Sequence, residues 1–153
     1  MNMIQFLKEI IDNNISYDNS FDYLDDIYKL NFPVDYKILM KSLKESTYFM
    51  DFIYLLNVEK ECKRVKEICL AYCESKNTFP NDFIHSPYPA ENCIFPCAVT
   101  DNGDEIYWLT SDWSIIIYEA RSSNYYKYNM TISEFLYKIS NNEIICPAFP
   151  DDL

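Results

Sequence analysis

The chain has a single glycine, Gly103, which follows Asn102 and lies between two apolar segments. An Asn-Gly pair in this setting is a strong β-hairpin signal, because a type I′ turn requires positive φ at both central residues. We therefore expect residues 94–100 and 105–110 to form antiparallel strands. This hairpin is the local structure that the sequence specifies most strongly.

Two further turns extend the hairpin into a four-stranded meander. The turn at Ser111 and Asp112 leads to a strand over residues 114–120. The turn at residues 122–124 leads to a strand over residues 125–129. Clusters of Ser, Asn and Asp between apolar runs are typical of such turns.

The strands of this meander differ in their apolar patterns. Residues 115–117 are three consecutive isoleucines, which is typical of a strand buried on both faces. In the strand before it, Ile106 and Trp108 alternate with Tyr107 and Leu109. The sheet thus has aromatic or aliphatic residues on both faces, so we expect its second face to be covered, either by the chain's own helices or by a partner.

Apolar residues at helical spacing predict five helices around the meander. They cover residues 4–13, 21–30, 34–44, 58–74 and 132–140. In the third, we expect Lys37, Lys41 and Lys44 to face solvent. Residues 47–56 read as one strand or a bent pair, and residues 77–93, with three prolines, as an irregular loop. Thr131 and Glu134 have capping-box spacing and open the last helix.

The acidic residues concentrate in the predicted sheet half of the chain. The net charge is −11, and residues 82–153 alone carry 11 acidic and 3 basic side chains. No basic stripe is present to contact phosphates, so we expect no nucleic-acid partner. An acidic surface attracts a basic protein, although net charge also serves solubility alone. At 153 residues and 49% hydrophobic composition, residues 1–153 fit one globular domain.

The six cysteines fit a reducing compartment. The first 14 residues are amphipathic rather than a continuous apolar segment, so they do not resemble a signal peptide, and no run is long enough to span a membrane. We therefore expect a cytoplasmic protein with free thiols and no membrane association. No C-x-x-C pair occurs, and Cys62, Cys69 and Cys73 share one helix face, where we expect them to be structural.

The sequence offers little catalytic machinery. His85 is the only histidine, and a hydrolase dyad of His85 with Cys93 or Cys97 is formally possible, whereas paired carboxylates cannot be judged from spacing alone. Asp101, Asp104 and Glu105 surround Gly103, but the spacing does not fit a calcium loop. A single glycine also rules out phosphate-binding glycine loops. We therefore expect no enzyme, no metal and no cofactor.

Two motifs resemble those of a known superfamily. The segment Phe32-Pro33-Val34-Asp35-Tyr36-Lys37, followed by Leu39-Met40, resembles a helix entry of the pattern L-P-x-x-Y-K-x-L-L. The segment from Ile94 to Trp108 is similar to the pattern l-x-P-f-g-x-t-x-n-G-d-x-l-y-W, with Cys97-Ala98 in place of phenylalanine-glycine. Both patterns occur in the SUKH superfamily of SMI/KNR-type immunity domains, which the chain resembles from residue 31 to the C-terminus.

The resemblance implies an α+β domain with helices packed against a curved, mainly antiparallel sheet that ends in the meander. It also implies a non-catalytic bacterial immunity protein that binds and neutralises a cognate polymorphic toxin, typically a basic nuclease or deaminase. Regulatory or scaffolding proteins without a toxin partner also belong to the superfamily, and this alternative stays open. The oligomeric state and the identity of the partner do not follow from the sequence.

For the partner contact we select residues that combine negative charge with an aromatic anchor, since aromatic side chains often dominate binding energies. These residues are Asp101, Asp104, Glu105, Asp112 and Trp113. Trp108 is expected to lie in the core instead. Packing at the sheet edge is an equally good role for Trp113.

Overall fold

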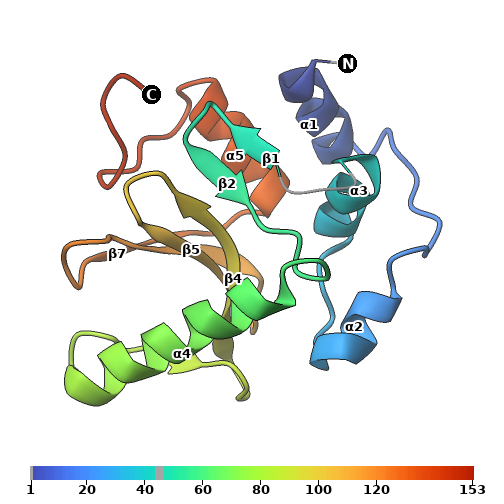
Figure 1. Cartoon of the computed structure of the whole chain (residues 1–153). Helices are drawn as coiled ribbons and strands as arrows, with labels where there is room; N and C mark the ends of the chain where they lie inside the picture. The colour runs from blue at the N-terminus through green and yellow to red at the C-terminus, as the bar shows by residue number, and fades with distance from the viewer. Residues whose placement is uncertain (1, 44–46) are drawn as a thin grey trace.

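The computed structural model describes residues 2–43 and 47–153 and has an α+β fold (Figure 1). The helices are α1 (Met3–Ile11), α2 (Tyr23–Tyr28), α3 (Val34–Leu43), α4 (Cys62–Thr78) and α5 (Ile132–Ser140). The strands are β1 (Thr47–Phe49), β2 (Ile53–Leu55), β3 (Ser86–Pro87), β4 (Cys93–Thr100), β5 (Glu105–Leu109), β6 (Ser114–Tyr118) and β7 (Tyr125–Tyr128). The strand order is β1-β2-β4-β5-β6-β7, all antiparallel, and β3 pairs with β4 in parallel. The predicted fold class is therefore confirmed.

The predicted meander is present as β4 to β7, but its first turn differs from the prediction. Gly103 N donates to Thr100 O at 2.9 Å, so Asp101 and Asn102 are the central residues of the turn. Neither has positive φ, whereas Gly103 has φ +88°. The predicted type I′ turn is therefore wrong. The glycine instead follows the turn and takes the left-handed conformation, as in longer hairpin loops.

The larger part of the core lies between one face of the sheet and helices α1, α2, α3 and α5 (Figure 1). Trp108 is fully buried there, with its ring edge-to-face against Tyr36 at a centroid distance of 4.8 Å. Ile115 and Ile117 point to the same face from β6. The expected core position of Trp108 is confirmed.

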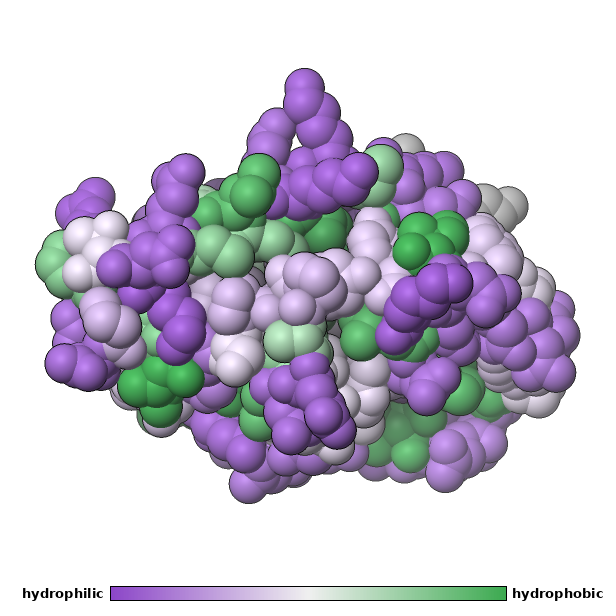
Figure 2. Space-filling view, turned by 90° about the horizontal axis from the view of Figure 1, so that it is seen from below, coloured by the Kyte–Doolittle hydropathy of each residue, from purple (hydrophilic) through white to green (hydrophobic). Residues whose placement is uncertain are grey.

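Helix α4 covers the opposite face of the sheet (Figure 1). Tyr72 of this helix packs against Tyr107 and Ile116, all three of which are buried. Figure 2 views the molecule from the α4 side and shows apolar patches interrupted by hydrophilic side chains. The chain's own helix α4, and not a partner, thus covers the face of the sheet that carries Tyr107 and Ile116. The expectation that residues 115–117 are buried on both faces is confirmed.

Helix α4 is displaced along the chain from its predicted position. The Asn57 side chain accepts hydrogen bonds from the backbone of Glu59 and Lys60, but the helix begins only at Cys62 and continues to Thr78. Cys62 is exposed, so it does not belong to the buried helix face on which it was predicted. Residues 47–56 form the bent pair, as β1 and β2.

Lys37 was predicted to face solvent, and this is wrong. Its side chain is 4% exposed, and its Nζ lies 2.9 Å from carboxylate oxygens of both Asp22 and Asp25. The carboxylates of α2 and the residue before it therefore neutralise the ammonium and join α2 to α3. Lys41 is exposed, and Lys44 lies outside the described residues.

No helix within the described ranges is long and apolar enough to cross a membrane.

Candidate protein-interaction surface

The five residues predicted for partner contact lie at opposite ends of the meander. Asp101, Asp104 and Glu105 belong to the β4–β5 turn and the start of β5. Asp112 and Trp113 belong to the β5–β6 turn, which is one strand length away. Because consecutive turns of a meander alternate between its two ends, the structure does not bring these five side chains into one surface.

The end that holds the β4–β5 turn collects carboxylates from four separate segments. We call it the acidic end and define it by Asp51, Asp101, Glu119, Asp151 and Asp152. Asp101 N donates to Phe52 O at 3.0 Å, which joins the β1–β2 and β4–β5 turns. Phe149, just before the two aspartates of the tail, stacks edge-to-face on Phe52 at 5.3 Å. These turns and the C-terminal tail lie together on the left of Figure 1.

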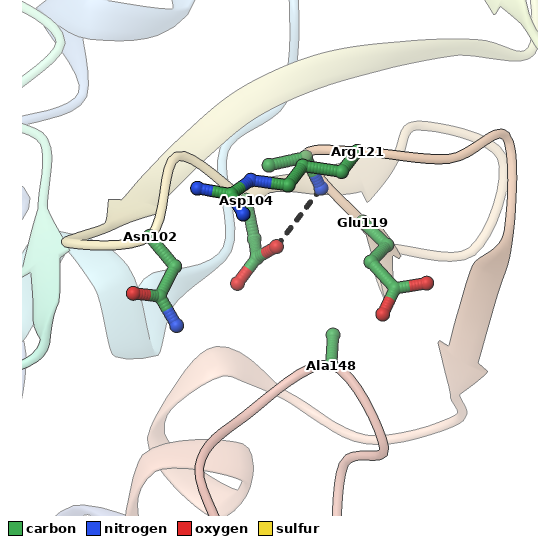
Figure 3. A pocket seen from close by; sticks show the side chains of 6 residues that line it. Asn102, Asp104, Glu119, Arg121 and Ala148 are labelled. Atoms are coloured by element: carbon green, nitrogen blue, oxygen red, sulfur yellow. Dashed lines mark hydrogen bonds between the residues drawn. The ribbon is translucent and has the colours of Figure 1, made fainter.

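Asp104 is not an exposed member of the acidic end, contrary to the prediction. It is 2% exposed, and its carboxylate accepts a hydrogen bond from Thr100 Oγ1 at 2.8 Å. It accepts a second from the backbone N of Ala120 at 2.9 Å, which is the dashed line in Figure 3. Both carboxylate oxygens of Asp104 thus accept hydrogen bonds from within the protein. The carboxylate joins the β4–β5 turn to the segment after β6, so its role is structural.

Glu105 is also partly withdrawn from solvent. Its carboxylate accepts a hydrogen bond from Tyr107 Oη at 2.8 Å, on the face of the sheet that α4 covers. Burial raises the pKa of Glu105, and the Tyr107 hydrogen bond opposes this only in part. Asp101, in contrast, is exposed. Of the three predicted residues at this end, Asp101 is therefore the one placed for direct contact.

A small polar pocket of about 240 Å³ lies at the acidic end (Figure 3). Its lining residues are Asn102, Asp104, Glu119, Ala120, Arg121 and Ala148. Arg121 is the one cationic side chain among these lining residues, and within residues 2–43 and 47–153 it forms no ion pair shorter than 4 Å. The pocket contains neither a thiol nor an imidazole, and among the described residues no group of three His, Cys, Asp or Glu side chains has a metal-binding arrangement.

His85 is not paired with either candidate thiol. Its Nδ1 lies 2.6 Å from Tyr118 Oη, on the α4 side of the sheet. The Cys93 sulfur has Thr110 Oγ1 as its neighbour at 3.6 Å. Cys97 is fully buried, and this burial raises the pKa of its thiol well above the ordinary value. A buried neutral thiol without an adjacent base is a poor nucleophile, so the geometry does not support the Cys–His dyad.

At the other end, Trp113 lies partly exposed between solvent and core. Its ring contacts Phe32 at a centroid distance of 5.7 Å and Trp108 at 5.6 Å. Asp112 is exposed and accepts hydrogen bonds from the backbone N and Oγ of Ser114. The sequence allowed either packing at the sheet edge or contact with a partner for Trp113. In the structure its ring packs against the core and is also partly accessible to solvent.

The sequence prediction missed four residues of the acidic end: Asp51, Glu119, Asp151 and Asp152. Glu119 follows β6, and the turns of a meander alternate between its two ends, so Glu119 lies at the same end as Asp101. The predicted meander could therefore have placed Glu119 at the acidic end. Asp51 is placed there only because β2 pairs with β4, with Ile53 opposite Thr100. That pairing joins segments far apart in the sequence and has no local signature.

Comparison of the chain with family models, curated proteins and solved structures returned no match.

Proposed function

We propose that this chain is an immunity-type protein, which binds a cognate toxin domain and neutralises it by protein–protein contact without chemistry of its own. The observation that supports the proposal most directly is the acidic end, where five carboxylates come from four chain segments and Arg121 is the one cationic side chain in the pocket between them. The resemblance of residues 31–153 to the SUKH superfamily points to the same function.

The partner that fits the acidic end is a basic protein domain. The turns that carry these carboxylates are closed by backbone hydrogen bonds, so little backbone entropy is lost when the carboxylates meet lysine or arginine. Such a surface also accelerates association with a basic partner. A nuclease or deaminase that binds phosphates carries a basic substrate site, and an acidic protein docked there excludes the nucleic acid.

The test is a charge-neutralised variant with a matched control. The first variant carries Asp51→Asn, Asp101→Asn, Asp151→Asn and Asp152→Asn. The control removes the same number of charges from exposed residues elsewhere, with Asp26→Asn, Glu74→Gln, Asp82→Asn and Glu91→Gln. We expect the first variant to associate about tenfold or more slowly with the basic toxin domain encoded beside this chain, and the control to change much less.

Co-expression tests the function itself. The native chain should protect cells from that toxin domain, and the variant of the acidic end should protect less than the control. If the toxin kills equally well in the presence of the native chain, immunity to that toxin is wrong.

A further inference from the structure

A second pocket, of about 370 Å³, lies at the end of the sheet opposite the acidic end. Four segments line it: the residue before α3, the β5–β6 turn, the linker after β7 and the first turn of α5. The lining residues are Pro33, Asp112, Trp113, Ser114, Asn129, Met130, Thr131 and Glu134. We call it the Trp113 pocket. Its walls are apolar at Pro33, Trp113 and Met130 and carry two carboxylates.

Hydrogen bonds hold the walls of the Trp113 pocket in fixed relative positions. The carboxylate of Asp35, in the first turn of α3, accepts from the backbone N of Ser133 at 3.0 Å and from its Oγ at 2.8 Å. This ties the first turns of α3 and α5 together. Thr131 Oγ1 accepts from the backbone N of Glu134 and caps α5. The pocket is therefore preformed, which lowers the entropic cost of binding.

Trp113 occupies its position at a conformational cost. Its φ is +59°, in the left-handed region that bulky residues rarely adopt and that glycine or asparagine tolerates far better. Its backbone N closes the turn by donating to Leu109 O. A glycine would satisfy this turn, so the turn itself gives no reason for a tryptophan. What the side chain adds is an indole that is packed on Phe32 and partly exposed at the pocket.

The two carboxylates of the pocket remain open to a cation. The Glu134 side chain has no hydrogen bond or ion pair to any described residue, and the bond from Glu134 to the Thr131 side chain comes from the Glu134 backbone N. Asp112 has one cationic neighbour, Lys127 at 3.5 Å, and both side chains are about half exposed. An exposed pair at this distance is weak and easily displaced. The α5 N-terminus by itself favours anions, but Thr131 and the Glu134 charge offset that preference.

We infer that the Trp113 pocket receives an arginine side chain of a basic partner protein. A guanidinium is planar, so it stacks on an indole face while its N–H groups donate to carboxylates on either side. The Trp113 pocket provides this combination with the indole, Asp112 and Glu134. Lysine offers a compact charge without a planar face and fits less well. This inference rests on the proposed function, since it assigns an anchor point for the same basic partner.

The test uses a short peptide and the intact chain. The peptide acetyl-Gly-Arg-Gly-amide is titrated into labelled protein and followed by the NMR resonances of the Trp113 indole N–H and the Glu134 amide. A peptide with citrulline, which has nearly the shape of arginine but no charge, is the matched ligand. We expect saturable shifts at both resonances with arginine, and shifts at least threefold weaker in affinity with citrulline.

Two isosteric variants test whether the negative charge of Glu134 contributes to binding of the arginine peptide. Glu134→Gln removes the charge, nearly keeps the shape of the side chain and leaves the Thr131 cap in place, and we expect it to weaken binding of the arginine peptide about two- to fivefold. The control is Glu143→Gln, an exposed residue just after α5, which should leave the affinity unchanged. Equal shifts with arginine and citrulline, or equal weakening by both variants, would overturn the inference.

The outcome also separates this inference from the proposed function. If the native chain neutralises a toxin domain but does not bind the arginine peptide, the Trp113 pocket is not the anchor and the proposed function stands. If the chain binds the peptide through Glu134 but protects against no basic toxin, the pocket stands and the proposed function is wrong.

Discussion

The two ends of the sheet use their carboxylates in different ways. At the acidic end, Asp104 is buried and satisfies the backbone, while Asp101 beside it stays exposed. At the opposite end, Asp112 is exposed, and the partly buried side chain is the aromatic ring of Trp113. Residues of one chemical type are therefore buried inside a turn at one place and exposed to solvent at another, and only the exposed ones are accessible to another molecule.

The largest effect that separates the two roles should come from Asp104→Ala. This change removes the side-chain acceptor of two hydrogen bonds, from Thr100 Oγ1 and from the backbone N of Ala120, so we expect a loss of about 2–3 kcal/mol in the free energy of unfolding. Urea denaturation measures it. Asp101→Ala, at an exposed residue three positions earlier in the chain, is the control and should stay within about 0.5 kcal/mol. Equal losses would remove the distinction between Asp104 and Asp101.

A smaller effect should follow from Gly103→Ala. An added Cβ would lie 3.5 Å from the Ala120 Cβ, which is an ordinary contact, so the cost comes from the φ of +88° alone. We expect a loss of about 1–2 kcal/mol in urea denaturation. Gly103→Asn should cost less, because asparagine tolerates the left-handed region better. An alanine variant as stable as the native chain would show that the turn can change its conformation.

The pH dependence of stability should have opposite signs at the two ends. Burial raises the pKa of Glu105 above its unfolded value, so its charged form opposes folding, and this penalty disappears as the pH falls. Partial burial also acts to raise the pKa of Asp112, but hydrogen bonds from Ser114 and the nearby Lys127 outweigh it and lower the pKa. The contribution of Asp112 is therefore favourable above its unfolded pKa and is lost as the pH falls further.

These signs are measured with Glu105→Gln and Asp112→Asn in urea at several pH values. Glu105→Gln should raise the stability at pH 7 relative to the native chain, and the gain should shrink toward about pH 4.5. Asp112→Asn should lower the stability at pH 7, and its loss should shrink below about pH 4. The same sign for both variants at pH 7 would contradict the assigned environments.

The smallest effect should come from Lys127→Gln at the Trp113 end. The ion pair with Asp112 is exposed and 3.5 Å long, so its loss should change the unfolding free energy by less than about 0.5 kcal/mol. Thermal unfolding measures this. The same variant leaves Asp112 without its cationic neighbour and should therefore bind the arginine peptide more tightly than the native chain. A loss above about 1 kcal/mol would mean that Lys127 supports the fold.

The sequence by itself determined the local elements. One glycine after an asparagine placed the first hairpin, three consecutive isoleucines marked a strand buried on both faces, and Thr131 with Glu134 marked the start of α5. These signals act over a few residues, since turn geometry, strand burial and helix capping are satisfied by near neighbours. The detailed turn type was missed because both conformations accept an Asn-Gly pair.

Only the tertiary structure decided which side chains are buried and which segments meet. Lys37 is buried because Asp22 and Asp25, more than ten residues away, neutralise it. Asp104 is buried where the backbone N of Ala120, sixteen residues later in the chain, donates a hydrogen bond to its carboxylate. Asp51 lies at the acidic end because β2 pairs with β4. Each of these contacts depends on chain segments that are distant in sequence, and the energy of burying a charge depends on the partners that those segments bring.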